Sequence, residues 1–364
     1  MKKILLNMIV KNEAKIITRL LNSVDGVIDA LVICDTGSSD DTVKIIQNWA
    51  NSKSISYKVI QDKWVNFGIN RTNAIDYAKE FLTNNNSKHE DWYLLFLDAD
   101  MELIIDSSFD KKNLNQQVYS LKQFNQNSFE YFNIRMARAD VSMQYECPTH
   151  EYLDVGNVQI ATLNSLRIKD IGDGGAKSDK FERDIKLLTE ALESEPENPR
   201  YLFYLANSYF DIGDYNHAKK WYQARCNVFG WDEERWYAKY KWGLCLLRLS
   251  SIQDAEKILL EAFQQRLWRA EPIFALAQYY HQQDDHIRAY TYALLASKLD
   301  TTKQDRLFID KNANGGNGPI EIISIHAYYI GLFEEGLHYT KKLISAFPEI
   351  EQHKKNLQIY INSL

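Results

Sequence analysis

The residues best suited to chemistry in this sequence are Asp98 and Asp100, which follow the mainly apolar run 92–97 and are separated by one residue. Such a run indicates a strand of a parallel sheet that is buried on both faces. Open α/β sheets bind ligands at the carboxyl ends of their strands, where these two carboxylates stand. Because paired carboxylates are costly to bury as bare charges, a divalent cation that also contacts phosphate is their natural partner. The pair predicts a nucleotide-diphosphate substrate; the alternative is a strand that ends in two solvated aspartates.

Two further segments carry groups that suit a nucleotide. The apolar run 30–34 ends in Asp35, which could accept hydrogen bonds from a base or ribose. A glycine turn and the hydroxyl and acidic residues 38–42 follow, and the start of a helix there would suit phosphate. Arg71 begins another helix and could bind a diphosphate through two parallel hydrogen bonds. For residues 38–42 the alternative is an ordinary turn with a helix cap. For Arg71 the alternative is an arginine on a helix surface.

Strand and helix patterns alternate through the first part of the chain, which is typical of a parallel α/β sheet. We expect strands over 4–10, 30–34, 57–60 and 92–97, and helices over 13–24, 42–50 and 70–82. No G-x-G-x-x-G follows the first strand and no G-x-x-x-x-G-K-[ST] occurs. A dinucleotide-binding fingerprint and a P-loop are therefore not supported.

Four segments in this order resemble the signatures of family 2 glycosyltransferases: 9–13, 32–42, 67–71 and 97–100. The resemblance covers roughly residues 1–175 and implies the GT-A fold, a Rossmann-like α/β fold with a mostly parallel sheet. It also implies inverting transfer of a sugar from a nucleotide diphosphate, usually UDP, with Mn²⁺ or Mg²⁺. The site residues that it implies are Val10, Glu13 and Asp35 around the nucleoside, Arg71 on the pyrophosphate, and Asp98 and Asp100 on the ribose and the metal.

An inverting displacement needs a carboxylate that takes the proton from the acceptor as the acceptor attacks. The candidates after the fourth strand include Asp140, Glu146, Glu151 and Asp154. The segment 148–153 resembles a His-Glu element of the tandem-repeat branch of these transferases, so we predict Glu151 as the base. His150 could orient the acceptor or reach the metal, the alternative being a structural histidine.

The stretch 166–177 indicates a further strand that ends in a glycine-rich loop over 170–177. Glycines let backbone amides approach a pyrophosphate, and Lys177 could neutralise its charge. Many GT-A enzymes supply a third metal ligand, usually a histidine, from such a late segment. Asp170 stands at the matching place here, with Asp173 as its rival. The alternative is a flexible linker between domains.

The second half of the chain repeats a helical pattern. A small residue is followed by an alanine at the same spacing in three copies: Ala206 to Ala218, Gly243 to Ala255, and Ala277 to Ala289. The copies recur about every 34 residues, as tetratricopeptide repeats do, and a weaker copy covers 323–348. We expect a GT-A domain over 1–177 and an all-α, tetratricopeptide-like solenoid over 178–364. Such arrays bind peptides, form dimers or buttress a neighbouring domain, so a homodimer through the repeats is one expectation.

Composition limits the remaining possibilities. The 364 residues allow about two domains, and 45% hydrophobic with 25% charged residues is normal for a globular protein. A net charge of −6 without a basic run argues against nucleic acid as a partner. No apolar run is long enough for a membrane span, and the first apolar run fits a strand better than a signal peptide. The four cysteines show no metal-ligand spacing, which suits reduced thiols in the cytoplasm.

Three functions remain open on the sequence alone. The leading one is a glycosyltransferase that acts on a protein or glycan acceptor. The second is a non-catalytic repeat scaffold with a vestigial sugar-nucleotide domain, against which the intact Arg71, Asp98, Asp100 and Glu151 argue. The third is a sugar nucleotidyltransferase, which the missing glycine-rich basic loop after the first strand disfavours.

Overall fold

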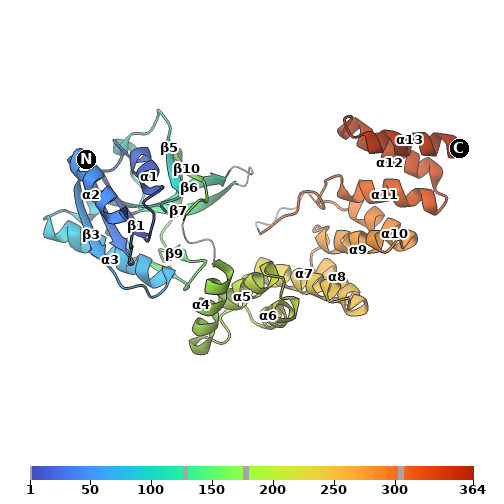
Figure 1. Cartoon of the computed structure of the whole chain (residues 1–364), viewed down its shortest axis with the longest axis horizontal. Coiled ribbons are helices and arrows are strands. Elements are labelled where there is room, and N and C mark those ends of the chain that lie inside the picture. Colours follow the sequence, from blue (N-terminus) through green and yellow to red (C-terminus); the bar gives the residue numbers. More distant parts are fainter. Residues whose placement is uncertain (1, 126–129, 175–179, 302–306) are drawn as a thin grey trace. The chain divides into compact units, whose positions relative to one another are not determined.

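The computed structural model describes residues 2–125, 130–174, 180–301 and 307–364, and the chain divides into two compact units, Met1–Leu187 and Leu188–Leu364. Figure 1 labels the elements of both units. The division falls after Leu187, inside a helix, and thus later in the chain than the 177/178 boundary expected from the sequence.

An eight-stranded sheet forms the centre of the first unit, with strand order β3-β2-β1-β4-β7-β6-β10-β5 (Figure 1). Its strands are β1 Lys3–Val10, β2 Ala30–Asp35, β3 Ser56–Gln61, β4 Trp92–Phe96, β5 Met101–Ile105, β6 Val118–Asn125, β7 Glu130–Arg138 and β10 Ile160–Asp170. The first four strands run parallel, while β7 is antiparallel to both β4 and β6. A separate hairpin joins β8 Gln144–Glu146 to β9 Tyr152–Asp154. The predicted α/β sheet is confirmed.

Three helices connect the parallel strands: α1 Ile17–Ser23, α2 Thr42–Ser52 and α3 Phe67–Asn84. Short 3₁₀ turns cover His89–Asp91 and Lys111–Asn113. The first helix begins at Ile17, later than the expected residue 13. Asn12 adopts a left-handed φ of 56°, and the carbonyl of Glu13 accepts backbone hydrogen bonds from Ile16 and Ile17 in a turn that precedes the helix. The backbone thereby bends at the carboxyl end of β1, where the sheet binds ligands.

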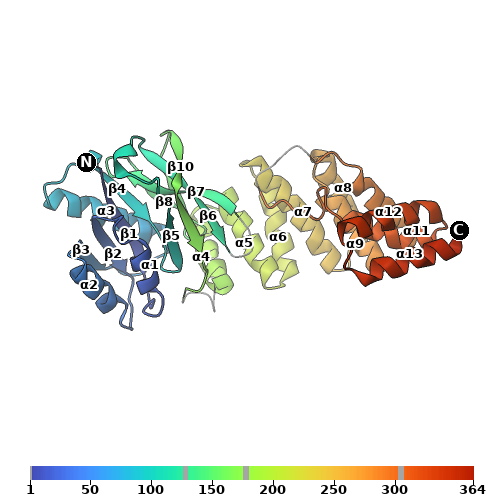
Figure 2. The same ribbon diagram turned by 90° about the horizontal axis from the view of Figure 1, so that it is seen from above.

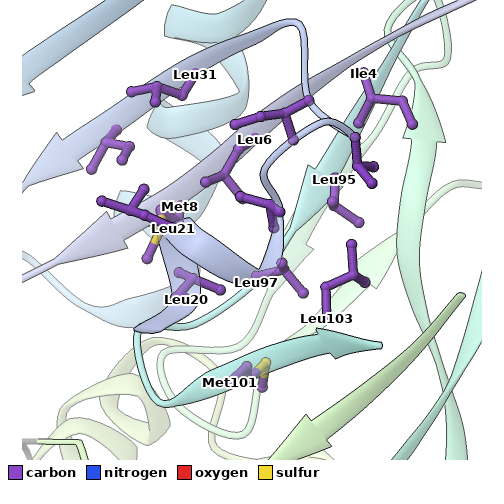
Figure 3. Close-up of a cluster of buried hydrophobic side chains, with 14 of the residues drawn as sticks. Ile4, Leu6, Met8, Leu20, Leu21, Leu31, Leu95, Leu97, Met101 and Leu103 are labelled. Carbon is purple, nitrogen blue, oxygen red and sulfur yellow. The ribbon is translucent and has the colours of Figure 1, made fainter. Parts of the chain in front are cut away.

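Both faces of the central strands are covered, as their continuous apolar runs predict. Alternate residues of β1 and β4, among them Leu6 and Leu95, pack with α1 and β5 in the cluster of Figure 3. The intervening residues, such as Leu5 and Leu94, pack with α3 on the other face. Each fully buried leucine contributes about 1.5–3 kcal/mol, so the carboxyl ends of β1 and β4 are held rigidly.

The second unit is built from successive helices that pack against their neighbours (Figure 2). They are α5 Pro199–Asp211, α6 Tyr215–Asn227, α7 Asp232–Arg248, α8 Ile252–Gln265, α9 Glu271–Gln282, α10 His286–Ser297, α11 Gly318–Tyr329, α12 Phe333–Ala346 and α13 Glu351–Ser363, preceded by α4 Lys180–Ser194, which crosses the division between the units. Small residues stand where helices touch: a Cβ at Gly243 would lie 2.5 Å from Leu259. The packed helices confirm the predicted repeat pattern. Close packing of the helices requires small residues at these positions, which explains why they recur in the sequence.

None of the helices that the structure describes combines the length and the apolar character needed to cross a bilayer.

Candidate functional site

A cavity of about 500 Å³ opens at the carboxyl ends of β1 and β4. Its walls come from these strand ends, the start of α3, strands β6 and β7, the segment 149–151, the end of β10 and the first turns of α4. The predicted site residues that line it are Val10, Glu13, Arg71, Asp98, Asp100, His150, Glu151 and Asp170. Segments far apart in the sequence thus converge where the sheet topology places a ligand.

Arg71 is held at the centre of this cavity by the local structure of α3. Asn66 caps the helix by accepting a hydrogen bond from the backbone of Ile69, and the fully buried Asn70 ties the first turn to the preceding loop. Gly68 lets the segment 147–148 approach, since a Cβ there would lie 2.3 Å from the carbonyl oxygen of Cys147. This close packing brings the segment that carries Glu151 against the helix that carries Arg71.

Arg71 joins two carboxylates in a charged network. Its Nε donates to Glu151 Oε1 at 2.7 Å, and its Nη2 donates to Asp98 Oδ1 at 2.5 Å. Arg135 of β7 approaches the other oxygen of Asp98 at 3.4 Å. Burial alone would raise the pKa of Asp98, but the two guanidinium groups hold that pKa below its ordinary value. Asp98 is therefore an ionised carboxylate that two arginines compensate.

Replacing Arg71 with methionine is expected to destabilise the first unit by roughly 3–5 kcal/mol, because Asp98 and Glu151 would lose the partner that compensates their buried charge. Urea unfolding of the full chain measures this loss. Arg138→Met is the matched control: it breaks a two-bond pair with Asp140 at the surface, worth about 0–1 kcal/mol. Equal stabilities of the two variants would show that the Arg71 network contributes little to the fold.

Asp100 and Asp170 form a second acidic group in the cavity. Burial, followed by the charges of Asp98 and Asp170, raises the pKa of Asp100. The loop after β10 lies directly on Asp100, and a Cβ at Gly174 would be 3.2 Å from its Oδ2. Gln123 of β6 holds Asp170 by donating to its Oδ2 at 3.2 Å.

This pair of carboxylates fits a hard divalent cation. Mg²⁺ is typically bound by one or two carboxylates, with phosphate and water completing its coordination. Across the described residues, no set of three or more His, Cys, Asp or Glu side chains is placed to hold an ion. Asp98, the third predicted ligand, faces Arg71 and Arg135 instead. Metal binding by Asp98, Asp100 and Asp170 stays a prediction, with Asp100 and Asp170 as the better-placed pair.

The glycine-rich loop contains two other candidate residues, Asp173 and Lys177. Asp173 does not line the cavity: Arg19 of α1 donates to both of its oxygens, at 2.8 and 2.6 Å. Its engagement by Arg19 favours Asp170 over Asp173 as the acidic partner of Asp100. Lys177 lies outside the described residues, so its proposed contact with the pyrophosphate stays a prediction.

Asp35 lies away from the cavity surface. The side chain is fully buried, and both of its oxygens accept a hydrogen bond from the backbone of Ser38 at 3.1 Å. It does not line the cavity, and these contacts are those of a turn cap. Its predicted role in binding the nucleoside is untested by this arrangement.

Among the candidate bases, Glu151 lines the cavity and the others do not. Asp140 pairs with Arg138, and Asp154 accepts a hydrogen bond from the backbone of Gly156. Glu146 lies in β8 and accepts a hydrogen bond from Gln144. The location favours Glu151 without establishing its role.

Sequence reasoning missed several polar residues of the cavity. Gln123 accepts hydrogen bonds from Arg135, so these two side chains connect the network around Asp98 to Asp170. Lys180, Arg183 and Asp184 enter from α4. The one available signal was Arg135 inside the apolar stretch of β7, since a buried arginine on a strand requires a partner.

Comparisons with known proteins agree with this arrangement. Residues 7–109 match the model of the family described as glycosyl transferase family 2, and residues 178–262 match the model described as anaphase-promoting complex, cyclosome, subunit 3. An uncharacterized glycosyltransferase of Rickettsia typhi is 29% identical over 173 residues, which cover 45% of this chain and 51% of that protein. The SPbeta prophage-derived glycosyltransferase SunS of Bacillus subtilis is 28% identical over 222 residues, covering 54% and 46%.

The chain thus spans about half the length of these curated relatives. Among solved structures, a crystal structure of MamA matches with a TM-score of 0.39 and 22% identity, over 48% of this chain and 94% of that chain. The family match begins within β1 and extends past β5, so it includes Arg71, Asp98 and Asp100, whereas Glu151 and Asp170 lie beyond it. Residues 7–109 therefore carry a glycosyl transferase family 2 domain, and a helical region with a tetratricopeptide-like repeat pattern follows it in the chain.

Proposed function

We propose that the chain is an inverting glycosyltransferase that moves a sugar from a nucleotide-diphosphate donor to a protein or glycan acceptor. UDP is the first candidate for the nucleotide of the donor. One observation carries the proposal: acidic groups and arginines, among them Arg71 and Arg135, share one cavity at the carboxyl ends of β1 and β4. Arg71, Asp98 and Asp100 of this cavity belong to the region that matches the family. Buried cations suit a diphosphate, and an acidic pair suits the metal that accompanies it.

Donor binding would use the two sides of the cavity. Val10 and Glu13, at the end of β1, would line the nucleoside pocket, and Arg71 would contact the pyrophosphate. Asp98 would contact the ribose, while Asp100 and Asp170 would hold Mn²⁺ or Mg²⁺. When bound, the cation would supply positive charge that stabilises the departing diphosphate.

In the transfer step, an atom of the acceptor bonds to the anomeric carbon as the bond from that carbon to the diphosphate oxygen breaks. Glu151 would take the proton that the acceptor releases. Arg71 pairs with Glu151 at 2.7 Å. A pyrophosphate that draws the guanidinium toward itself would release Glu151, so donor binding would precede activation of the acceptor.

The repeat region would recruit the acceptor or form a homodimer, both of which are common uses of stacked helical repeats. Its aromatic residues Tyr201 and Trp236 are buried and serve packing. The four cysteines are free thiols, which suits a reducing compartment such as the cytoplasm.

Release of UDP from a UDP-sugar tests the proposal directly. The purified full chain should release UDP slowly in the presence of Mn²⁺, with water replacing the acceptor, and EDTA should stop the reaction. A non-catalytic repeat scaffold would release no nucleoside diphosphate from any UDP-, GDP- or dTDP-sugar, whatever metal is added. That result would overturn the proposed activity.

A further inference from the structure

The helix α4 places a buried carboxylate, Asp184, in the wall of the cavity. The residue is 1% exposed. Its Oδ1 accepts a hydrogen bond from Thr149 Oγ1 at 2.8 Å. Its Oδ2 makes no hydrogen bond within the described part of the chain and lies 3.5 Å from His150 Nε2. Both partners belong to the segment that ends in Glu151. Asp184 therefore contacts the candidate catalytic segment from outside the region that matches the family.

Asp184 is held in its charged form by these contacts. Burial alone would raise the pKa of the carboxyl group, but the interactions with His150 and Thr149 hold that pKa below its ordinary value. A buried carboxylate costs several kcal/mol unless polar partners compensate it. The buried charge of Asp184 therefore depends on its contacts with Thr149 and His150.

The backbone of this segment adopts a conformation that separates two neighbouring side chains. His150 has a left-handed φ of 52°, a strained conformation for a non-glycine residue that persists only where the surrounding structure imposes it. The backbone of Phe67 donates to the carbonyl of Pro148 at 3.0 Å and anchors the turn to α3. His150 reaches Asp184 while Glu151 reaches Arg71, so each side chain has its own charged partner.

We propose that Asp184 is a positioning residue that fixes the imidazole of His150 beside Glu151, so that His150 orients the acceptor. This inference rests on the proposed glycosyl transfer. An imidazole whose Nε2–H faces a carboxylate keeps its lone pair on Nδ1. That nitrogen accepts a hydrogen bond from a second polar hydrogen of the acceptor, while Glu151 receives the proton of the attacking group.

The spectroscopic part of the test uses Asp184→Asn in the full chain, with ¹⁵N-labelled histidine observed by NMR. In the wild type, His150 should be present as the Nε2–H tautomer. In the variant it should become a mixture of tautomers, because an amide can donate or accept. Asp184→Glu should restore the wild-type tautomer. An identical His150 signal in the wild type and Asp184→Asn would overturn the proposed coupling.

The kinetic part uses hydrolysis of UDP-glucose, UDP-galactose and UDP-N-acetylglucosamine, with water as the acceptor. Asp184→Asn should lower kcat by about 10- to 100-fold, the range found when the carboxylate partner of a metal-ligating histidine is lost, while KM for the UDP-sugar stays unchanged. Asp184→Glu should recover part of that loss.

Thr149→Val is the matched control, since it removes the hydrogen bond from Thr149 to Asp184 and leaves His150 in place. If Thr149→Val lowers kcat as much as Asp184→Asn does, Asp184 acts as a structural clamp and the inference is wrong. Absence of hydrolysis in the wild type would instead refute the proposed function, and the NMR result would still decide whether Asp184 positions His150.

Discussion

Replacing Glu151 with glutamine is expected to lower UDP-sugar turnover by about two to four orders of magnitude, the usual contribution of a general base. Glutamine keeps the shape of the side chain but cannot accept the proton of the acceptor. Binding of UDP, measured by calorimetry, should survive, because Arg71 keeps its second partner Asp98.

Glu146→Gln is the matched control for this substitution, since Glu146 lies in β8 and does not line the cavity. It should leave turnover within a few-fold of the wild type. If Glu151→Gln weakens UDP binding as much as turnover, Glu151 belongs to the donor site. Wild-type turnover in Glu151→Gln would return the role of base to Asp140 or Asp154, which the structure places outside the cavity.

Replacing Asp100 with asparagine is expected to lower metal-dependent turnover by on the order of a hundred-fold or more, because a catalytic cation contributes several kcal/mol to the transition state. Thermal unfolding without ligand should change little or improve. The charged form of Asp100 is disfavoured in the folded state by burial and by Asp98 and Asp170, so a neutral side chain relieves that cost.

Asp173→Asn provides the control, since Arg19 holds Asp173 outside the cavity. It should keep turnover close to that of the wild type. Unchanged turnover in Asp100→Asn, or full activity in EDTA, would refute a metal-dependent mechanism.

The parallel half of the sheet was predictable because β1, β2 and β4 are continuous apolar runs that can only be buried on both faces. The strands from β5 to β10 carried no comparable signal. In β10, buried residues such as Leu166 and Ile168 alternate with exposed ones along only part of the strand, and its register shifts against β6. Pairings of this kind depend on tertiary context, which a local pattern does not contain.

The site was predictable where a single local segment determines it. Asp98 and Asp100 follow soon after β4, and Arg71 lies near the start of α3, so their sequence positions indicate the edge of the sheet where they lie. Arg135 and Asp184 enter the cavity from a later strand and from α4. Their polar partners are distant in the sequence, and only the folded chain brings them together.

A thermal-shift series tests the central claim, that this cavity binds a nucleotide-diphosphate sugar together with a divalent cation. UDP-, GDP- and dTDP-sugars are added to the full chain with Mn²⁺ or with EDTA, and the series is repeated with Asp100→Asn. A ligand at a hundredfold excess over its Kd stabilises the folded state by about 2.7 kcal/mol. We predict that a UDP-sugar raises the melting temperature of the wild type only with Mn²⁺, and that Asp100→Asn loses this rise. If no nucleotide sugar raises it, or if the rise is the same in EDTA and in Asp100→Asn, the account is contradicted.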